Sequence, residues 1–463
     1  MQKTKKMLAF AMIACLVSGV SAGCAKNGMP AWQSLSTSAK DYSSAQEKRV
    51  YLTYAGWGTA NEKNVTQKAI DTFNAMTKSI KVSYMHIPTD YSAKMATLAA
   101  ANQLPDVFMF FKEISAKWGE DENLYNLKEF LDKDKDIDES KLIPNALLKV
   151  SDDKVIGIKI CEEVFANYYN VDMFREAGVE MPPATADNAW DWDKFVEISK
   201  KMTMDEDGNN AHSPDFDPNR IKQYGVRFNR WMWSLFFDSN QAGIVTPDKS
   251  KLNLTDPAIT ESIQKLADLI NVHHVAPTLT EEKDIPNPSV ALQSRRIAMD
   301  LDGQWINVDL GTAGMNFDVG VLPKMKVPST VQFGELIVMS GQVKYKEEAW
   351  VLLKWMINPE VNADIYKSGL WMPIVKEWYT DPQLLARWAT VKPGHSRGFK
   401  TAVVDVLLEH GSNNHGYWLK NSEEINAAVT TALDDVWLGL KSAHDAFEEL
   451  EPQLAAKYKG VYD

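Results

Sequence analysis

Residues 50–111 alternate strand-like apolar runs with segments of helical spacing, and this alternation constrains the fold more than any other feature of the sequence. The strand-like runs are rich in β-branched and aromatic residues, whereas the segments between them carry apolar residues three or four positions apart. The runs alternate in the order strand, helix, strand, helix, strand along residues 50–54, 65–76, 80–84, 90–101 and 107–111. Because strands separated by helices pair in parallel, the sequence predicts an α/β fold with a doubly wound sheet.

The remaining 350 or so residues continue in the same style, and the length of 463 residues allows two or three domains at about 150 residues each. Apolar residues at helical spacing predict helices over 259–270, over 349–357 and through the tail from Asn421 to Lys459. No tandem repeat is found.

The N-terminus has the pattern of an export signal. Lys3, Lys5 and Lys6 precede an apolar run over 7–20 that is short for a membrane span. Small residues then lead into Cys24, as in the bacterial lipoprotein signal, although Ser21 stands where Leu is usual. We expect a signal peptide over 1–23 and a lipidated Cys24; the alternative is an ordinary secretory signal cut near Ala22.

The polar segment 24–47 predicts a flexible tether, and no later segment is apolar and long enough to span a membrane. Of the three cysteines, only Cys24 and Cys161 remain after processing. If Cys24 carries lipid, Cys161 has no disulfide partner, and we expect it to be a small buried apolar residue.

The overall charge argues against nucleic acid as a partner, because 62 acidic residues outnumber 50 Lys and Arg and the net charge is −12. The aromatic content points in another direction. The chain has 15 Trp, 15 Tyr and 17 Phe. Most of these belong to the core, and the excess of Trp favours a surface that stacks on flat ligands.

Catalytic and metal-binding motifs are largely missing. The sequence has no phosphate-binding loop, no nucleophile elbow and no zinc-binding His-Glu-x-x-His motif. The segment 56–61 begins like a dinucleotide-binding motif but lacks its third Gly. We therefore expect no cofactor, no metal and no enzymatic activity.

Five stretches, in order, resemble the extracellular solute-binding proteins of bacterial ATP-driven importers, specifically the carbohydrate-binding group that includes maltose-binding protein. They include Tyr-Ala-Gly-Trp-Gly, Leu-Pro-Asp-Val-Phe, Tyr-Tyr-Asn-Val-Asp-Met-Phe, Asp-Gly-Gln-Trp and Asp-Val-Gly-Val-Leu-Pro. They begin at positions 54, 104, 168, 302 and 318.

The resemblance implies two α/β lobes joined by crossing strands, which close on a ligand like a clamp. It implies a carbohydrate ligand, importer permease subunits as partners, attachment to the membrane through Cys24, and a monomer. The expected segments are a first lobe, a second lobe, a return to the first lobe and a return to the second lobe with the C-terminal helices, over 48–160, 161–330, 331–375 and 376–463.

Candidate ligand residues follow from the resemblance and from the rule that open α/β sheets bind ligands beyond the carboxyl ends of their strands. Phe111 is the alternative to Phe110, because neighbouring strand residues point to opposite faces, and Glu162 is the alternative to Glu163. Asp302 is expected to accept a hydrogen bond from a sugar hydroxyl, and Trp231 and Trp233 would share a face if they lie in a strand. The full set is Trp57, Phe110, Glu113, Glu163, Trp231, Trp233, Asp302, Trp305, Glu335, Trp371 and Trp418.

These residue types suit a sugar, because aromatic rings cover the apolar C–H face of a pyranose while carboxylates accept hydrogen bonds from its hydroxyl rim. Their number favours an oligosaccharide. Two alternatives remain open: a receptor of the same fold for a peptide, a polyamine or an organophosphate, and a secreted glycoside-active enzyme.

Overall fold

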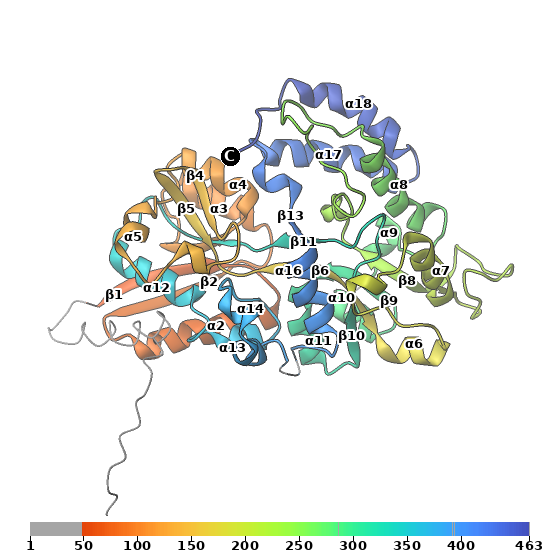
Figure 1. The fold of residues 1–463 in the computed structure, drawn as a ribbon, viewed down its shortest axis with the longest axis horizontal. Helices are drawn as coiled ribbons and strands as arrows, with labels where there is room; N and C mark the ends of the chain where they lie inside the picture. Colours follow the sequence, from red (N-terminus) through yellow and green to blue (C-terminus); the bar gives the residue numbers. More distant parts are fainter. Residues whose placement is uncertain (1–48, 286, 391, 393, 463) are drawn as a thin grey trace, which may run out of the picture.

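The computed structural model describes residues 49–285, 287–390, 392 and 394–462. The expected signal peptide, the lipidation site Cys24 and the whole tether lie outside these residues. The described chain forms two α/β lobes, each built on its own sheet, so the predicted fold class is confirmed. Figure 1 shows the first lobe on the left and the second on the right, and each lobe is built from separate segments of the sequence.

The first sheet has six strands in the order β2-β1-β3-β12-β5-β4. β1 pairs in parallel with β2 and β3, as the strand–helix alternation predicted, and β12 is antiparallel to β3 and β5. The strands are β1 (Val50–Gly56), β2 (Ile80–His86), β3 (Val107–Phe110), β4 (Leu147–Ser151), β5 (Lys154–Lys159) and β12 (Leu336–Met339).

Helices pack around this sheet because their apolar faces need cover. Ile70 and Phe73 of α2, for example, are fully buried in the same core as Leu52 and Tyr54 of β1. The first-lobe helices are α2 (Ala60–Met76), α3 (Tyr91–Ala100), α4 (Lys112–Glu120), α5 (Lys128–Lys133), α12 (Lys346–Ile357), α13 (Ala363–Lys367), α14 (Glu377–Thr380) and α15 (Pro382–Ala386).

The second sheet runs in the order β13-β11-β6-β9-β8-β7, with β10 also paired to β6. β6 is buried along its whole length, including its polar residues Glu163, Asn167 and Asn170. The strands are β6 (Glu163–Asn170), β7 (Met204–Asp205), β8 (Ile221–Phe228), β9 (Ile297–Gly303), β10 (Phe317–Gly320), β11 (Thr330–Phe333) and β13 (Gly411–Asn413).

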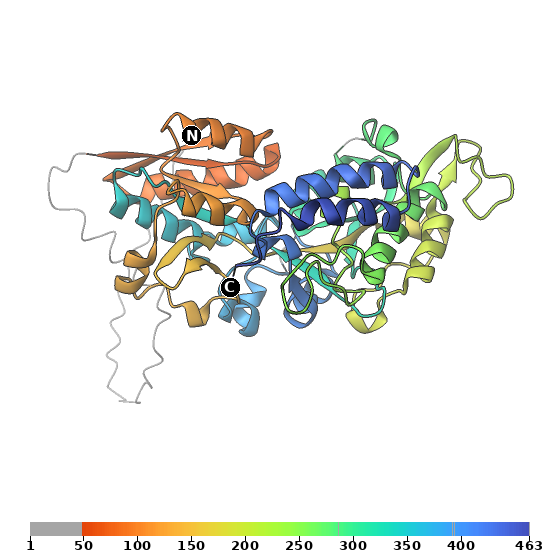
Figure 2. The same cartoon turned by 90° about the horizontal axis from the view of Figure 1, so that it is seen from above.

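The helices of the second lobe include two long C-terminal ones, which lie at the top of the lobe in Figure 1 and face the viewer in Figure 2. The tail predicted as one helical stretch is two helices, because the chain turns at Gly439, which has φ +69°. The helices are α6 (Val171–Ala177), α7 (Trp192–Met202), α8 (Pro257–Asn271), α9 (Leu279–Glu282), α10 (Pro288–Gln293), α11 (Asn307–Ala313), α16 (Val406–His410), α17 (Ser422–Trp437) and α18 (Ala443–Ala455).

Short helical turns complete the two lobes. They are the 3-10 turns η2 (Glu139–Lys141), η3 (Ala186–Asn188), η4 (Arg230–Met232), η5 (Gln304–Ile306) and η7 (His415–Trp418), and the π-helical turn η6 (Lys400–Asp405).

The chain crosses between the lobes at neighbouring places. Residues 160–162 lead from β5 to β6, and residues 334–335 lead back from β11 to β12. The two crossings are hydrogen-bonded side by side, because the Ile160 N–H donates to the Glu335 carbonyl at 2.8 Å. A third passage lies between α15 and η6, since η6 packs against β6 and β10 of the second lobe.

The observed crossings differ in detail from the expected segment boundaries. The expected boundary at 330/331 falls inside β11, which belongs to the second sheet through its pairing with β6. The expected boundary at 375/376 also falls early. Lys376 still bonds to the first lobe, its N–H donating to the Lys141 carbonyl at 2.9 Å, and α14 follows directly.

Gly334 in the second crossing offers a test of how tightly the hinge is packed. Its φ is +134°, and a Cβ there would lie 2.3 Å from the Cys161 carbonyl oxygen of the first crossing. We expect Gly334→Ala to lower the free energy of unfolding in urea by about 2 kcal/mol or more. Gly314→Ala is the matched control: it also has a positive φ (+66°) but open space around the added carbon. Equal losses in both variants would contradict the close packing of the crossings.

Candidate functional site

A cavity of about 920 Å³ lies between the lobes, next to the two crossings. Nine of the eleven predicted ligand residues line it, contributed by both lobes. They are Trp57, Glu113, Glu163, Trp231, Trp233, Asp302, Trp305, Glu335 and Trp371. Its size is near the top of the range of about 300–1,000 Å³ that is usual for ligand sites.

An aromatic wall in the first lobe is formed by Trp57 and Phe111. Trp57 follows β1, and its ring stacks on Phe111 with centroids 4.4 Å apart and planes inclined by 25°. Gly58 has φ +118°, and a Cβ there would collide with the Glu62 carboxylate, which folds over it. The space over Gly58 is therefore occupied by Glu62.

Phe110 lies in the core rather than in the cavity. It is fully buried, with its ring 4.4 Å from that of Trp118. Strand alternation turns neighbouring side chains to opposite faces, so Phe111, the alternative considered from sequence, lines the cavity instead.

An aromatic wall in the second lobe is formed by Trp231 and Trp305. Their rings are stacked, with centroids 6.3 Å apart and planes inclined by 27°. Phe165 and Phe333 support them edge-on. The indole of Trp305 lies over Gly303, where a Cβ would stand 2.1 Å from the ring, so the Gly-x-Trp sequence is needed for this ring position.

Trp231 and Trp233 both line the cavity, but not as expected. They belong to or follow the 3-10 turn η4 rather than a strand, so they do not share a strand face. Trp231 is 52% exposed, whereas Trp233 is buried and its Nε1 donates to Asn426 Oδ1 at 2.9 Å.

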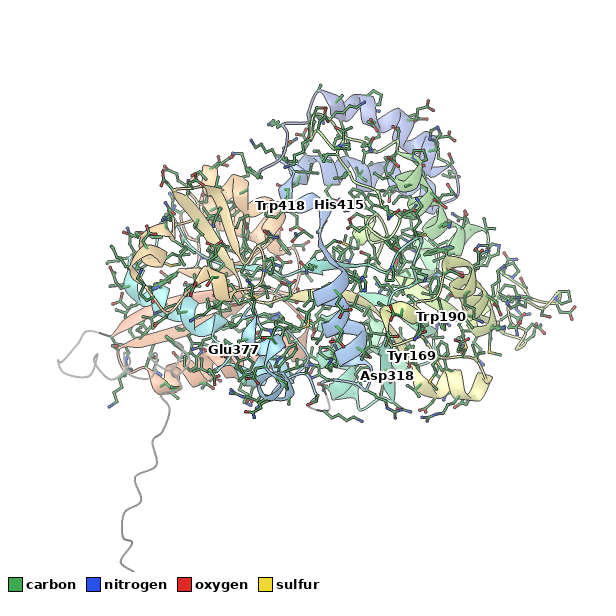
Figure 3. All side chains as sticks on the ribbon, in the orientation of Figure 1. Tyr169, Trp190, Asp318, Glu377, His415 and Trp418 are labelled. Atoms are coloured by element: carbon green, nitrogen blue, oxygen red, sulfur yellow. The ribbon has the colours of Figure 1, made fainter. Side chains whose placement is uncertain are left out.

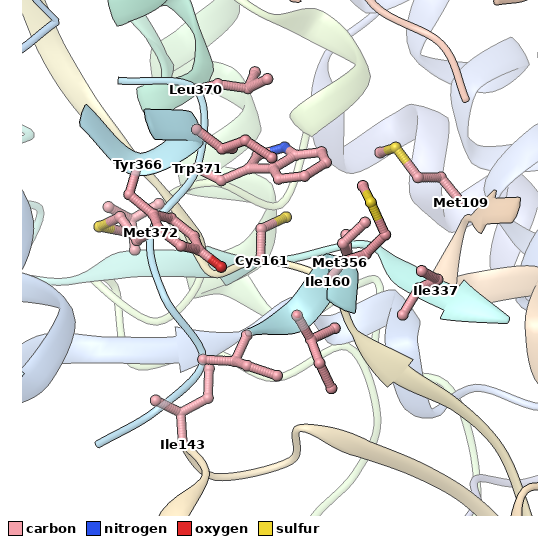
Figure 4. Packing of buried hydrophobic residues seen from close by; sticks show 14 of the residues in the cluster. Met109, Ile143, Ile160, Cys161, Ile337, Met356, Tyr366, Leu370, Trp371 and Met372 are labelled. Atoms are coloured by element: carbon pink, nitrogen blue, oxygen red, sulfur yellow. The ribbon is translucent and has the colours of Figure 1, made fainter. Parts of the chain in front are cut away.

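Trp371 and Trp418 are placed differently from one another. Trp371 is buried among apolar side chains beside Cys161 and borders the cavity (Figure 4). Trp418 lies at the upper junction of the lobes in Figure 3 and does not line the cavity; its ring is 4.7 Å from Lys112 Nζ. Cys161 is buried, as expected.

Three carboxylates meet beside the crossings. Glu163 begins β6, Glu335 lies in the second crossing, and Glu113 is in the first turn of α4. Burial, reinforced by Glu62 and Glu162, raises the pKa of Glu163 to about 8. Burial raises the pKa of Glu113 to about 7. It also raises the pKa of Glu335 well above its usual range, with Glu113 and Glu163 adding to the effect.

Glu162, the alternative to Glu163, points away from the cavity. Its Oε2 accepts a hydrogen bond of 2.8 Å from Lys159 Nζ, and both side chains are buried. The same lysine donates to the Phe333 carbonyl at 3.2 Å. This pair joins the two crossings, and Glu163 alone of the two carboxylates faces the cavity.

Asp302, the residue before the last of β9, lies in a network of polar side chains. Its Oδ1 accepts from Asn229 Nδ2 at 2.7 Å, and its Oδ2 lies 3.6 Å from Arg227. Burial outweighs the attraction of Arg227 and raises the pKa of Asp302 to about 6.

Sequence reasoning missed Glu62 and Asp309, which also line the cavity. Asp309 of α11 accepts from Asn61 Nδ2 at 2.6 Å and from Thr59 Oγ1 at 3.2 Å, across the two lobes. Burial, with Asp309 nearby, raises the pKa of Glu62 to about 7. A Thr three residues before a Glu is typical of a helix start. The sequence around Thr59 and Glu62 therefore indicates a helix cap and gives no sign that Glu62 lines a cavity.

The lobes also touch on the far side of the cavity. Ser422 Oγ at the start of α17 donates to the Glu113 carbonyl of α4 at 2.7 Å. Together with the contacts of Asp309, this places direct bonds between the lobes on both sides of the cavity.

Comparison with known proteins agrees with this architecture. A family model for bacterial extracellular solute-binding proteins matches residues 68–393. The chain belongs to this family. Its members are extracellular binding proteins, which places the chain outside the cytoplasm and confirms the family that the sequence resembles. Within the described part of the chain, no helix combines the length and apolar composition of a membrane span.

Individual relatives are distant. A putative binding protein of Brucella abortus is 22% identical over 255 residues, which are 53% of this chain and 58% of that protein. The chain therefore spans little more than half the length of this curated relative.

Two solved structures share the fold. An ABC substrate-binding protein of Listeria monocytogenes in complex with cycloalternan has a TM-score of 0.75 at 21% identity, over 89% of this chain and 99% of that one. Maltose-bound MalE3 of T. maritima has a TM-score of 0.70 at 17% identity, over 88% and 99%.

The buried carboxylates predict an unusual pH dependence of stability. A carboxyl group whose pKa is raised on folding binds more protons in the folded state, so stability falls as pH rises from the unfolded value of 4.5 through the folded value. We expect the melting temperature to fall between pH 5 and 8, and Glu163→Gln to reduce this slope. The exposed Glu448→Gln is the control and should leave the slope unchanged. A slope identical in all three proteins would show that Glu163 is ionised throughout.

Proposed function

We propose that the protein is a lipid-anchored extracytoplasmic receptor that binds a carbohydrate, an oligosaccharide, between its lobes and delivers it to the permease of an ABC importer. The observation that carries the proposal is the cavity with an aromatic wall on each lobe and carboxylates between the walls. The ligands of the two structural neighbours, cycloalternan and maltose, are both saccharides.

The free energy that stacking on the aromatic walls contributes can be compared with the binding free energy that a receptor needs. A sugar face that hides about 50 Å² on an indole contributes about 1 kcal/mol at ~25 cal/mol per Å². Micromolar affinity requires about 8 kcal/mol, so one stack is insufficient. Two walls and several charge-assisted hydrogen bonds together reach this range, which supports a ligand of more than one sugar unit.

Ligand delivery follows from the same geometry. A ligand that touches both walls binds the state in which the lobes meet more tightly than a state in which they are apart, and so shifts the population toward the former. The permease would then recognise the surface formed by the joined lobes. The organophosphate alternative loses support, because no Lys, Arg or His occurs among the described residues that line the cavity.

A glycan screen tests the carbohydrate ligand. We expect one family of oligosaccharides to raise the melting temperature of the purified protein, because binding to the folded state alone stabilises it. Trp231→Ala should weaken that binding about tenfold, since the side chain is 52% exposed and its removal leaves the core intact. Tyr51→Ala, 69% exposed outside the cavity, is the control. A shift with peptides or polyamines alone would refute the carbohydrate ligand, and shorter glycan products on chromatography would favour an enzyme.

Membrane attachment is tested at Cys24. We expect the protein expressed in a bacterial host to sediment with membranes and to take up radiolabelled palmitate, and Cys24→Ser to lose both properties. Cys15→Ser, in the expected signal peptide, is the matched control and should retain both. A Cys24→Ser protein that stays with the membranes would contradict lipid anchoring at this residue.

A further inference from the structure

The charge of the cavity lining is one-sided. Seven carboxylates face the cavity, whereas no Lys, Arg or His is among the described residues that line it. In the described part of the chain, Asp302 alone of the seven forms an ion pair, with Arg227 at 3.6 Å. The others are Glu62, Glu113, Glu163, Asp309, Glu335 and Glu423.

Three cationic side chains lie behind the lining, and other groups engage them. Lys159 pairs with Glu162 at 2.8 Å, and Arg227 pairs with Asp300 at 3.1 Å. Lys112 lies 4.7 Å from the ring of Trp418. With Glu162 and Asp300 included, the cavity and its surroundings contain nine carboxyl groups and these three cationic side chains. When the carboxyl groups are ionised, the region therefore has an excess of negative charge.

The charged groups of the lining are acceptors when they are ionised. Two amides of the lining are already engaged: Asn414 donates to Glu113 at 3.5 Å, and Asn426 accepts from Trp233. Glu335 Oε2 is buried and has no hydrogen-bond partner among the described atoms. A neutral sugar hydroxyl both donates and accepts, whereas an ammonium group has three donors and no acceptor.

The aromatic walls suit the same chemistry. An indole face attracts a cation as well as an apolar C–H face, and the cation gains most where water is excluded. Trp57 and Phe111 on one side and Trp231 and Trp305 on the other border the cavity that contains the unpaired carboxylates. A ligand that combines pyranose rings with positive charge uses both features of the site.

We propose that the ligand is a basic saccharide, an oligosaccharide that carries one or more protonated amines, with an ammonium group received by Glu113, Glu163 and Glu335. This inference rests on the proposed function and specifies its substrate class. The three carboxylates come from α4, β6 and the second crossing, so an ammonium among them would touch both lobes and the hinge. Burying an ionised carboxylate without a cationic partner costs free energy. A cationic ligand bound among these carboxylates would supply that partner.

The test compares amine-bearing saccharides with their neutral twins by isothermal titration calorimetry at pH 7. The probes are glucosamine oligomers of two and three units, which are β-linked, and kanamycin, which is α-linked; the twins are the same compounds fully N-acetylated. Spermidine is the cation without a sugar. We expect an amine-bearing saccharide to bind at least about tenfold more tightly than its twin.

Proton counting is the second measurement. An ammonium that enters among partly protonated carboxyls expels protons, so the binding heat should differ between phosphate and Tris buffers in the direction of proton release. Glu163→Gln and Glu335→Gln should each weaken binding of the amine more than that of the twin and reduce the release. Glu448→Gln should change neither, and melting curves verify that each variant is folded.

Each outcome decides the inference. Equal or tighter binding of the neutral twins overturns the basic ligand and retains the carbohydrate receptor. Binding of spermidine without any saccharide overturns the inference and the proposed function together. No binding by any amine-bearing saccharide overturns the inference, while the glycan screen still decides the proposed function.

Discussion

The arrangement of this molecule depends on one buried lysine between two crossing segments. Lys159, the last residue of β5, is fully buried and bonds both to Glu162 of the first crossing and to the carbonyl of Phe333, the last residue of β11 before the second crossing. A buried ion pair adds little net stability but leaves an uncompensated charge if one partner moves. The pair therefore holds the crossings in register, and Gly334 lets them approach closely.

The register of the crossings determines which side chains face the ligand cavity. With Glu162 turned to Lys159, the next residue, Glu163, faces the opposite side and lines the cavity. Glu335, in the second crossing, comes to the same place because the Phe333–Glu163 pairing aligns β11 with β6. The hinge and the most perturbed carboxyl groups are thus one structural unit, so charge at the ligand and the geometry of the hinge are physically linked.

The lobes contribute different parts of the site. The first lobe supplies Trp57, Phe111 and Glu62 from loops and helix starts after its strands, and the second supplies Trp231, Trp305 and Asp302. This follows the general rule that open α/β sheets bind ligands beyond the carboxyl ends of their strands. The contacts of Asp309 and Ser422 join the two lobes directly, so bonds within the protein favour the arrangement in which the lobes meet.

The sequence by itself determined the strand–helix alternation, the parallel pairing of β1 with its neighbours, and nine of the residues that line the cavity. These follow from local periodicity and from motifs such as Gly303-x-Trp305, whose glycine makes room for the ring. Only the tertiary structure decided between Phe110 and Phe111 and between Glu162 and Glu163, placed Trp418 outside the cavity, and brought in Glu62 and Asp309. Neighbouring residues on a strand point to opposite faces, and which face lines the cavity depends on partners that are distant in sequence. Glu162 is turned away from the cavity by its bond to Lys159, and Lys159 is itself bonded to the carbonyl of Phe333 at the end of β11.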